Sequence, residues 1–251
     1  MSLTTLVGMP LVGPGDDLAD LILDILKQTD LVLADGDILV VAQKIVSKSE
    51  GRAVKLAGVR PSERAVQLAE ATEKDPRLVE LILSESRKIV RHRSGVIITE
   101  NRQGVVLANA GIDHSNVETD GDTEQVLLLP LDPDASAARL REWLRERAQA
   151  EVAVIINDSL GRAWRNGTVG TALGVAGLPA LLDLRGRPDL FGEPLRVSEQ
   201  AIADELSAAA SLLQGQAAEG QPVVLIRGYG VSASNTPASA LIRPKEKDLF
   251  R

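Results

Sequence analysis

The chain has 251 residues with 28 basic and 35 acidic side chains, and its net charge of −7 disfavours a non-specific nucleic-acid or anionic-membrane partner. A hydrophobic content of 44% is typical of a globular protein, and with 2% aromatic residues the core must be mainly aliphatic. The absence of cysteine and the presence of only two histidines exclude disulfides, thiolate or His-rich metal sites and Cys nucleophiles, so any metal should be a hard cation with oxygen ligands.

The first predicted elements are a short strand, a helix and a buried strand. Residues 3–12 are predicted to form the strand. Apolar residues with helical spacing predict a helix over residues 18–27, which Asp16 or Asp17 can cap. Residues 38–42 (ILVVA) form a continuous apolar run of strand length, which indicates a buried strand.

Two helices and a hairpin are predicted next. Ser62 can cap a helix over residues 63–73, and a second helix over 76–88 begins with a proline, which suits a first helical turn. Two strand-like runs follow at 95–99 and 104–108, and the polar residues between them suit a hairpin turn.

The remaining segments lead to an α+β fold class. The predicted elements are a strand at 126–129, a helix at 135–150, a strand at 152–156, a glycine-rich segment at 161–177, a helix at 198–213 and a strand at 223–226. Strands and helices do not alternate strictly, which favours α+β over a doubly wound sheet. Since no repeat or linker marks a boundary, we expect a single domain over residues 1–251.

The chain shows no sign of membrane insertion or export. It has no run of about 18 apolar residues. Residues 1–5 (MSLTT) lack the basic start and apolar stretch of a signal peptide. We therefore expect a soluble, cytoplasmic protein.

A first candidate motif follows the buried strand, where residues 43–52 read QKIVSKSEGR. Lys44, Lys48 and Arg52 are each four residues apart, so their side chains can converge if the segment is helical or turns back. Ammonium groups suit phosphate as point charges. The alternative is a solvated charged face.

A second candidate motif is NAGIDHSN at residues 109–116. Asp113 can be a ligand of a hard metal ion, and Asn116 can bind a base or a phosphate. The alternative is an Asx turn, in which Asp and Asn side chains bond to their own backbone.

A third candidate motif is NDSLGRAWRNGTVG at residues 157–170. Asp158 and Ser159, at a predicted strand end, can share a divalent ion, and the glycines let backbone N–H groups approach an anion. Arg162 and Arg165 can bind carboxylates or phosphates through two hydrogen bonds each. The alternative is a glycine-rich structural loop.

Other motifs narrow the class of enzyme. A polar loop, QGQAAEGQP, occupies residues 214–222, and a plain connection is the alternative there. The chain contains no P-loop motif, no dinucleotide-binding fingerprint and no nucleophile elbow. The residues alone therefore indicate phosphate and a hard divalent metal, which is typical of a nucleotide-dependent enzyme.

The three motifs, in this order, resemble those of the coenzyme F420:L-glutamate ligase family, and the resemblance covers nearly the whole chain. It implies a GTP-dependent ligase of deazaflavin biosynthesis. Such an enzyme adds L-glutamate to the terminal carboxylate of F420-0 through an acyl phosphate, can add further γ-linked glutamates, and releases GDP and phosphate.

The resemblance also implies an architecture. The family has mixed and antiparallel sheets with flanking helices, a two-lobed subunit and an intertwined homodimer. Many actinobacterial members carry a C-terminal flavin-binding reductase domain. This chain is too short to include it, so the free-standing form or an isolated N-terminal domain is expected.

The family's site residues can be carried over by motif. The implied cofactors are two divalent ions, Mg²⁺ or Mn²⁺, and a K⁺ ion. The implied metal ligands are Asp113, Asp158, Ser159 and Gln216. The implied GTP contacts are Met9, Pro10, Leu11, Val12, Gln43, Lys44, Lys48, Asn116, Gln214, Gly215, Gln216 and Gln221. The catalytic set is Asp113, Asp158, Lys48, Arg162 and Arg165, the two arginines being our hypothesis for holding substrate carboxylates or phosphate.

This chain departs from the family at a few of these positions. The family usually has Thr in place of Ser159 and small hydroxyl residues in place of Gln43 and Lys44, and some members have Glu in place of Gln216. Two alternative functions remain: another nucleotide-dependent carboxylate–amine ligase, and a non-catalytic sensor of nucleotide or coenzyme. The presence of both Asp113 and Asp158 disfavours the sensor.

Overall fold

The computed structural model describes residues 1–114, 124–230 and 236–249. In chain order its helices and strands are β1 (Ser2–Thr5), α1 (Leu18–Gln28), β2 (Ile38–Ala42), α2 (Gln43–Ser49), β3 (Ala53–Lys55), α3 (Glu63–Thr72), α4 (Pro76–Ser84), β4 (Ser86–Arg93), β5 (Val96–Asn101), β6 (Val106–Ala108), β7 (Gln125–Leu127), α5 (Pro133–Ala148), β8 (Ala153–Arg162), β9 (Arg165–Ala176), β10 (Leu182–Asp183), β11 (Glu199–Gln200), α6 (Ile202–Gln214) and β12 (Val223–Arg227). Short 3₁₀ turns complete the set.

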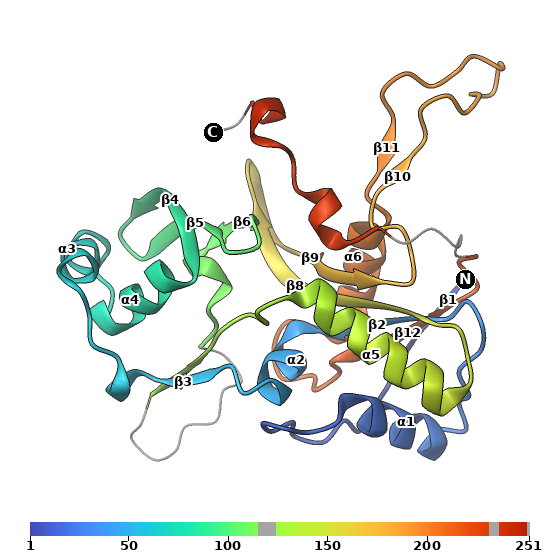
Figure 1. The fold of residues 1–251 in the computed structure, drawn as a ribbon, viewed down its shortest axis with the longest axis horizontal. Helices are drawn as coiled ribbons and strands as arrows, with labels where there is room; N and C mark the ends of the chain where they lie inside the picture. The colour runs from blue at the N-terminus through green and yellow to red at the C-terminus, as the bar shows by residue number, and fades with distance from the viewer. Residues whose placement is uncertain (115–123, 231–235, 250–251) are drawn as a thin grey trace.

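A five-stranded mixed sheet forms the centre of the molecule (Figure 1). Its strand order is β1-β12-β2-β8-β9. The pair β2 and β8 is parallel, and the other neighbours are antiparallel. The mixed sheet and its flanking helices confirm the predicted α+β class.

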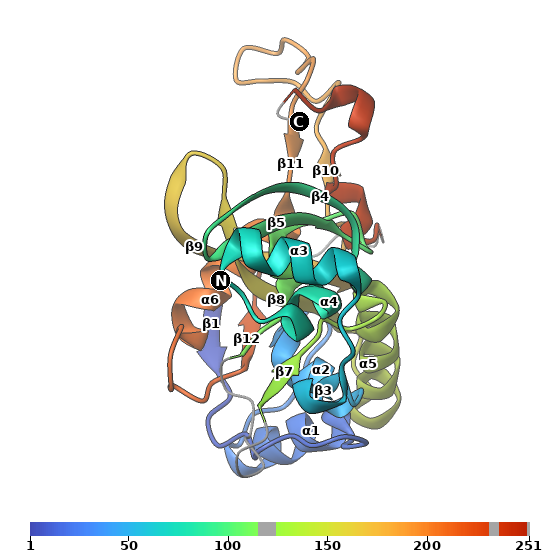
Figure 2. The same ribbon diagram turned by 90° about the vertical axis from the view of Figure 1, so that its left-hand side faces the viewer.

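The central strands are buried on both faces, which is why they read as continuous apolar runs. On β2, Leu39 and Val41 belong to the core cluster that contains α1 and α5. Ile38 and Val40, which alternate with them, belong to the cluster that contains α6. Figures 1 and 2 show these helices on opposite sides of the sheet.

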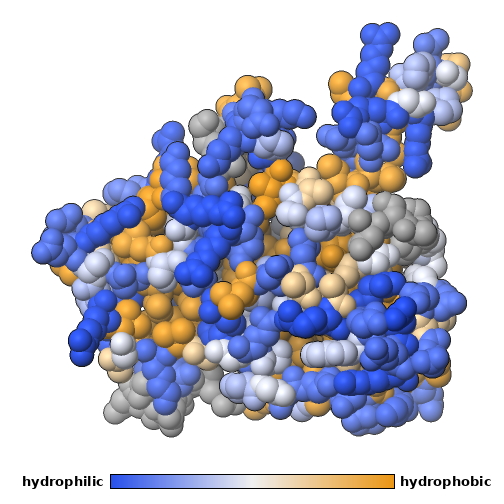
Figure 3. All heavy atoms as spheres, viewed as in Figure 1, coloured by the Kyte–Doolittle hydropathy of each residue, from blue (hydrophilic) through white to orange (hydrophobic). Residues whose placement is uncertain are grey.

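A smaller unit packs beside this sheet around a core of its own. It consists of α3, α4, the β3–β7 pair and the sheet β4-β5-β6. On the face seen in Figure 3, hydrophobic residues lie among the hydrophilic ones over this unit. The Arg52 guanidinium links the unit to α2, because it pairs with Glu85 at 3.0 Å and donates to the Leu129 carbonyl at 2.9 Å.

Two predicted boundaries are wrong. The strand expected over residues 3–12 ends at Thr5, because Gly8 has a φ of +93° and Pro10 has no N–H to donate. The helix expected over 76–88 ends at Ser84, where the following charged segment pairs with β5 as strand β4. That strand was missed because its basic residues show no apolar alternation.

The end of the chain also differs from prediction. The helix expected from residue 198 begins at Ile202, since residues 199–200 pair with β10. The hairpin of β10 and β11 projects from the body of the molecule in Figures 1 and 2. No helix in the described part of the chain is long and apolar enough to cross a membrane.

The largest correction concerns the glycine-rich segment 161–177. The strand predicted to end before Asn157 continues as β8 to Arg162, and β9 runs back beside it. The glycines permit close packing of helices on β9. A Cβ on Gly170 would lie 2.2 Å from the Ser207 carbonyl oxygen, and one on Gly174 would lie 2.1 Å from that of Pro133. The segment therefore lacks apolar alternation although it is a strand.

Candidate active site

The candidate site lies at one edge of the central sheet, where four segments meet. The parallel strands β2 and β8 both end there, with Ala42 opposite Asn157. Helix α2 therefore starts next to Asp158. Since β12 is antiparallel to β2, the loop before β12 enters at the same edge, where the Ala42 N–H donates to the Pro222 carbonyl at 2.8 Å. Strand β1 also ends at this edge, so residues 9–12 lie close by.

These segments enclose a cavity of about 350 Å³. It brings together predicted residues from distant parts of the sequence. Those lining it are Met9, Pro10, Leu11, Val12, Gln43, Lys44, Lys48, Asp158, Ser159, Gln214, Gly215, Gln216 and Gln221. Polar amides, two lysines and one carboxylate thus share one small space.

Asp158 is the carboxylate of this cavity, and its environment disfavours the charged form. Burial raises the pKa of Asp158 from 3.8 to about 6, against the opposing effects of the Lys44 charge and a hydrogen bond from the Ser159 N–H. The nearby carboxylate of Asp113 raises it further. The side chain keeps some surface open to the cavity, but protein atoms replace most of its water.

Asp113 lies next to the cavity through its contact with Lys44, but it is not one of the residues that line the cavity. A one-residue bridge to Leu127 holds it beside β7, and its carboxylate pairs with the Lys44 ammonium at 2.5 Å. Lys44 itself lines the cavity. The two carboxylates expected to act together therefore lie around one cation.

Buried amides form a second feature of the cavity. Gln43 is 1% exposed, and its Oε1 accepts a hydrogen bond from the Ser47 hydroxyl at 2.9 Å. Its Nε2 is buried and has no hydrogen-bond partner among the residues that the structure describes. Asn157 and Gln214 instead bond reciprocally, at 2.8 and 3.1 Å.

Some predicted residues lie elsewhere. Arg162 and Arg165 are exposed at the end of the β8–β9 hairpin and do not line the cavity. Asn116 lies outside the described residues. Gln216 accepts a hydrogen bond from the Thr168 hydroxyl at 3.3 Å, so it connects the cavity to this hairpin.

Sequence reasoning missed Asn157 as a wall residue. It is 2% exposed and fixes Gln214 at the start of the loop. A polar residue directly after the apolar run of β8 was the available signal, but its partner is 57 residues away in the chain.

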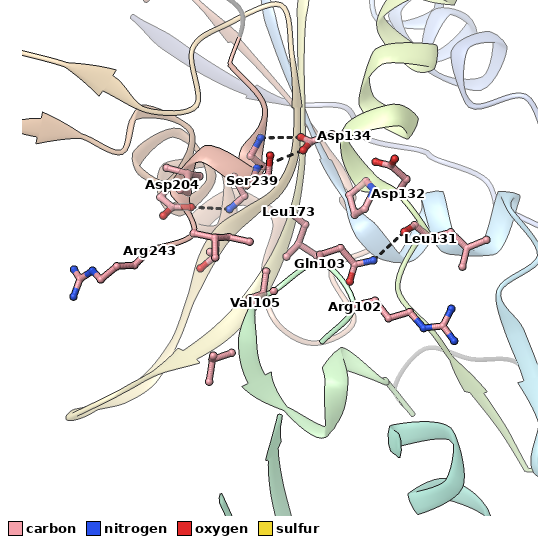
Figure 4. Close-up of a pocket in the computed structure, with 18 residues that line it drawn as sticks. Arg102, Gln103, Val105, Leu131, Asp132, Asp134, Leu173, Asp204, Ser239 and Arg243 are labelled. Atoms are coloured by element: carbon pink, nitrogen blue, oxygen red, sulfur yellow. Dashed lines mark hydrogen bonds between the residues drawn. The ribbon is translucent and has the colours of Figure 1, made fainter. Parts of the chain in front are cut away.

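A larger cavity of about 580 Å³ lies along the outer edge of β9 (Figure 4). It contains none of the predicted site residues. Its carboxylates accept from backbone: Asp134 from the N–H groups of Val175 and Ala238 at 2.9 and 2.8 Å, and Asp204 from that of Ala172 at 2.9 Å. These groups cap the edge strand, so this cavity has no comparable set of polar groups awaiting a ligand.

The residues at the smaller cavity suit a hard divalent cation. The candidate donors are the Asp113 and Asp158 carboxylates, the Ser159 hydroxyl and the Gln216 amide oxygen, which are all oxygen ligands. The Lys44 ammonium pairs with the Asp113 carboxylate beside the cavity. No cluster of three or more His, Cys, Asp or Glu side chains occurs in the described ranges, so water or substrate oxygens would complete the coordination.

Comparisons with known proteins identify the family of this chain. The family model described as F420-0:Gamma-glutamyl ligase matches residues 7–228. The chain is 49% identical over 253 residues to the coenzyme F420:L-glutamate ligase of Methanothermobacter thermautotrophicus, covering 100% of this chain and 99% of that protein. It is 46% identical to the protein of that name from Methanopyrus kandleri, over 96% of this chain and 93% of the other. The chain therefore belongs to the F420-0:gamma-glutamyl ligase family.

Proposed function

We propose that this protein is a GTP-dependent ligase that joins L-glutamate to the terminal carboxylate of F420-0. Membership of the ligase family supports the reaction class. The observation that carries the nucleotide assignment is the convergence of Lys44, Lys48 and the loop at residues 214–222 on one cavity beside Asp158.

The lysines account for phosphate binding in this proposal. Lys44 and Lys48 project from consecutive turns of α2, so both ammonium groups can approach the same phosphate chain. Lys48 forms no ion pair within the described part of the chain, and its charge is available to a ligand.

Asp113, Asp158, Ser159 and Gln216 would hold Mg²⁺ or Mn²⁺, and the proposed K⁺ would bind in the same region. When bound, a divalent ion neutralises charge on the phosphates during phosphoryl transfer. The residues of the chain bind and orient the reactants. No protein nucleophile is required, in agreement with the absence of cysteine.

The proposed chemistry has two steps. A carboxylate oxygen of F420-0 attacks the γ-phosphorus of GTP, the bond to the β-phosphate oxygen breaks, and GDP leaves. The amine of L-glutamate then attacks the acyl phosphate carbonyl, the C–O bond to phosphate breaks, and the amine loses a proton as the amide forms. The carboxylate of F420-0 must be activated because a free carboxylate is a poor electrophile. The acyl phosphate reacts with the amine because phosphate is a good leaving group.

The direct test is a phosphate-release assay with GTP, Mg²⁺ or Mn²⁺, L-glutamate and F420-0, followed by mass spectrometry of the coenzyme. We expect phosphate release together with a mass gain of one or more glutamyl units. Intact GTP and an unchanged coenzyme mass with both metals would contradict the proposal. Phosphate release with a different acceptor only would indicate another carboxylate–amine ligase.

A further inference from the structure

The tip of the β8–β9 hairpin carries an exposed tryptophan between two arginines. Trp164 is 78% exposed, and Arg162 and Arg165 beside it are exposed as well. In Figures 1 and 2 the hairpin rises beyond the sheet. The chain has only two tryptophans, one tyrosine and two phenylalanines, and Trp164 is the more exposed of the two tryptophans.

The backbone at the tip indicates that this ring is not there for the turn itself. Trp164 has a φ of +60°, in the left-handed region. Glycine or asparagine adopts that region with less strain, and bulky residues rarely occupy it. The backbone conformation of the turn therefore does not favour tryptophan. We attribute the presence of a tryptophan at this position to an interaction of its side chain.

The tip is continuous with the candidate active site. Strand β8 leads from Asp158, at the cavity, to Arg162 in four residues, about 13 Å at 3.3 Å per residue. The hydrogen bond between Thr168, four residues after Trp164, and Gln216 joins the hairpin to the cavity loop.

The charge of the tip is positive. Residues 159–171 contain two arginines and no aspartate or glutamate, in a chain whose net charge is −7. A guanidinium group binds carboxylates and phosphates, and an indole stacks on a planar aromatic ring. An extended ligand with an aromatic ring at one end and anionic groups along its tail fits this arrangement.

We propose that the hairpin tip recognises the acceptor: Trp164 stacks on its deazaflavin ring, and Arg162 and Arg165 bind its anionic side chain. The terminal carboxylate then reaches the cavity beside Asp158. This inference rests on the proposed function for the identity of the acceptor. It adds a specificity-determining residue, Trp164, and gives the two arginines a place outside the nucleotide cavity.

The first experiment uses tryptophan fluorescence without GTP, so that it does not depend on catalysis. The Trp143→Phe variant leaves Trp164 as the only tryptophan, and the Trp164→Phe variant leaves only Trp143 on α5. Titration with F420-0 should quench the fluorescence of Trp143→Phe strongly, by stacking. The quenching in Trp164→Phe should be clearly weaker. Equal quenching in the two variants would overturn the proposal.

The second experiment separates acceptor binding from nucleotide binding. Trp164→Ala should raise the KM for F420-0 by at least about tenfold, the loss expected for one stacked ring. The KM for GTP should stay within about twofold, and Trp164→Phe should restore most of the acceptor affinity. Trp143→Phe is the matched control and should leave both constants unchanged.

Two outcomes would overturn the inference. One is an unchanged KM for F420-0 in Trp164→Ala. The other is a changed molar mass by light scattering with unchanged F420-0 binding, which would make Trp164 a contact between copies of the chain. Failure of the proposed function is distinguishable, because a wild-type protein that binds F420-0 through Trp164 but adds no glutamate would contradict only the ligase assignment.

Discussion

The cavity at the end of β2 and the larger cavity along β9 differ in the hydrogen bonding of their polar groups, which their volumes do not show. The larger one, at the edge of β9, has carboxylates that already accept backbone N–H groups, as Asp134 does from Val175 and Ala238. The smaller one contains Asp158, whose pKa burial raises to about 6, and Gln43, whose buried Nε2 has no partner among the described residues. Burial also raises the pKa of Asp204 in the larger cavity, but that carboxylate accepts the Ala172 N–H. Buried polar groups without full partners are costly, so where they persist a ligand is the natural explanation.

The comparison of the two cavities indicates different roles for their carboxylates. Asp134 and Asp204 hold α5 and α6 against an edge strand, and they contribute to folding. Asp158 is buried at a cost, because burial raises its pKa, and in the proposed function it is a metal ligand. Exchanging carboxylates for neutral side chains in the two places should therefore have opposite consequences.

The largest expected effect is on catalysis at the smaller cavity. Asp158→Asn removes a charge that the proposed divalent ion requires, and ligase turnover should fall by about 10²–10³-fold. Phosphate release measured at saturating GTP and glutamate checks this. Asp134→Asn is the matched variant in the larger cavity, and its activity per folded molecule should remain near that of the wild type. Similar turnover losses in the two variants would remove the distinction between the cavities.

The next effect is on stability at the larger cavity. Asp134→Ala leaves the N–H groups of Val175 and Ala238 without their acceptor, and should lower the free energy of unfolding by about 2–4 kcal/mol. Urea unfolding followed by circular dichroism measures it. Asp24→Ala, which removes only an exposed ion pair with Lys27, should change stability by less than about 1 kcal/mol. A loss no greater than that of the control would show that Asp134 does not hold this edge.

Asp158→Asn should also stabilise the metal-free protein, by up to about 3 kcal/mol at pH 8. The folded protein raises the pKa of Asp158 from 3.8 to about 6, so ionisation opposes folding. This penalty is complete above pH 6 and disappears as the pH falls below about 4, where both states are protonated. Thermal unfolding at pH 8 and at pH 4 tests it. A variant less stable than the wild type at pH 8 would contradict the burial argument.

The smallest effect concerns nucleotide affinity. Lys48→Ala should raise the KM for GTP by about tenfold. This is the loss of affinity expected when one charge-assisted hydrogen bond to a phosphate is removed. The KM for L-glutamate should change less. Lys27→Ala, at an exposed site on α1, is the control. If the KM for GTP is unaffected by Lys48→Ala, the nucleotide does not lie along α2.

The sequence was most informative where local pattern and local structure agree. The apolar run of β2 predicted a buried strand, and Asp17 caps α1 as expected. Lys44 and Lys48, four residues apart, lie on one helix, which is one of the two arrangements that the sequence left open. Much of the cavity lining also follows from the first and third motifs, because they follow β2 and β8 at the same sheet edge.

The sequence was least informative where tertiary packing decides the structure. Strand β9 has glycines at positions where helix backbone approaches closely, such as Gly174, so strand periodicity is lost. The pairing of Asn157 with Gln214 joins residues that no local pattern connects. The two-lobed subunit and the homodimer stay predictions, as do the bound metals.

The central claim is that the smaller cavity binds the nucleotide and the larger one does not. Amide hydrogen exchange with and without GTP and Mg²⁺ measures both cavities in one experiment. We predict slower exchange at α2 and at residues 214–221, which line the smaller cavity, and no change at residues 238–243, which line the larger. Protection at residues 238–243 with none at α2 would contradict the account.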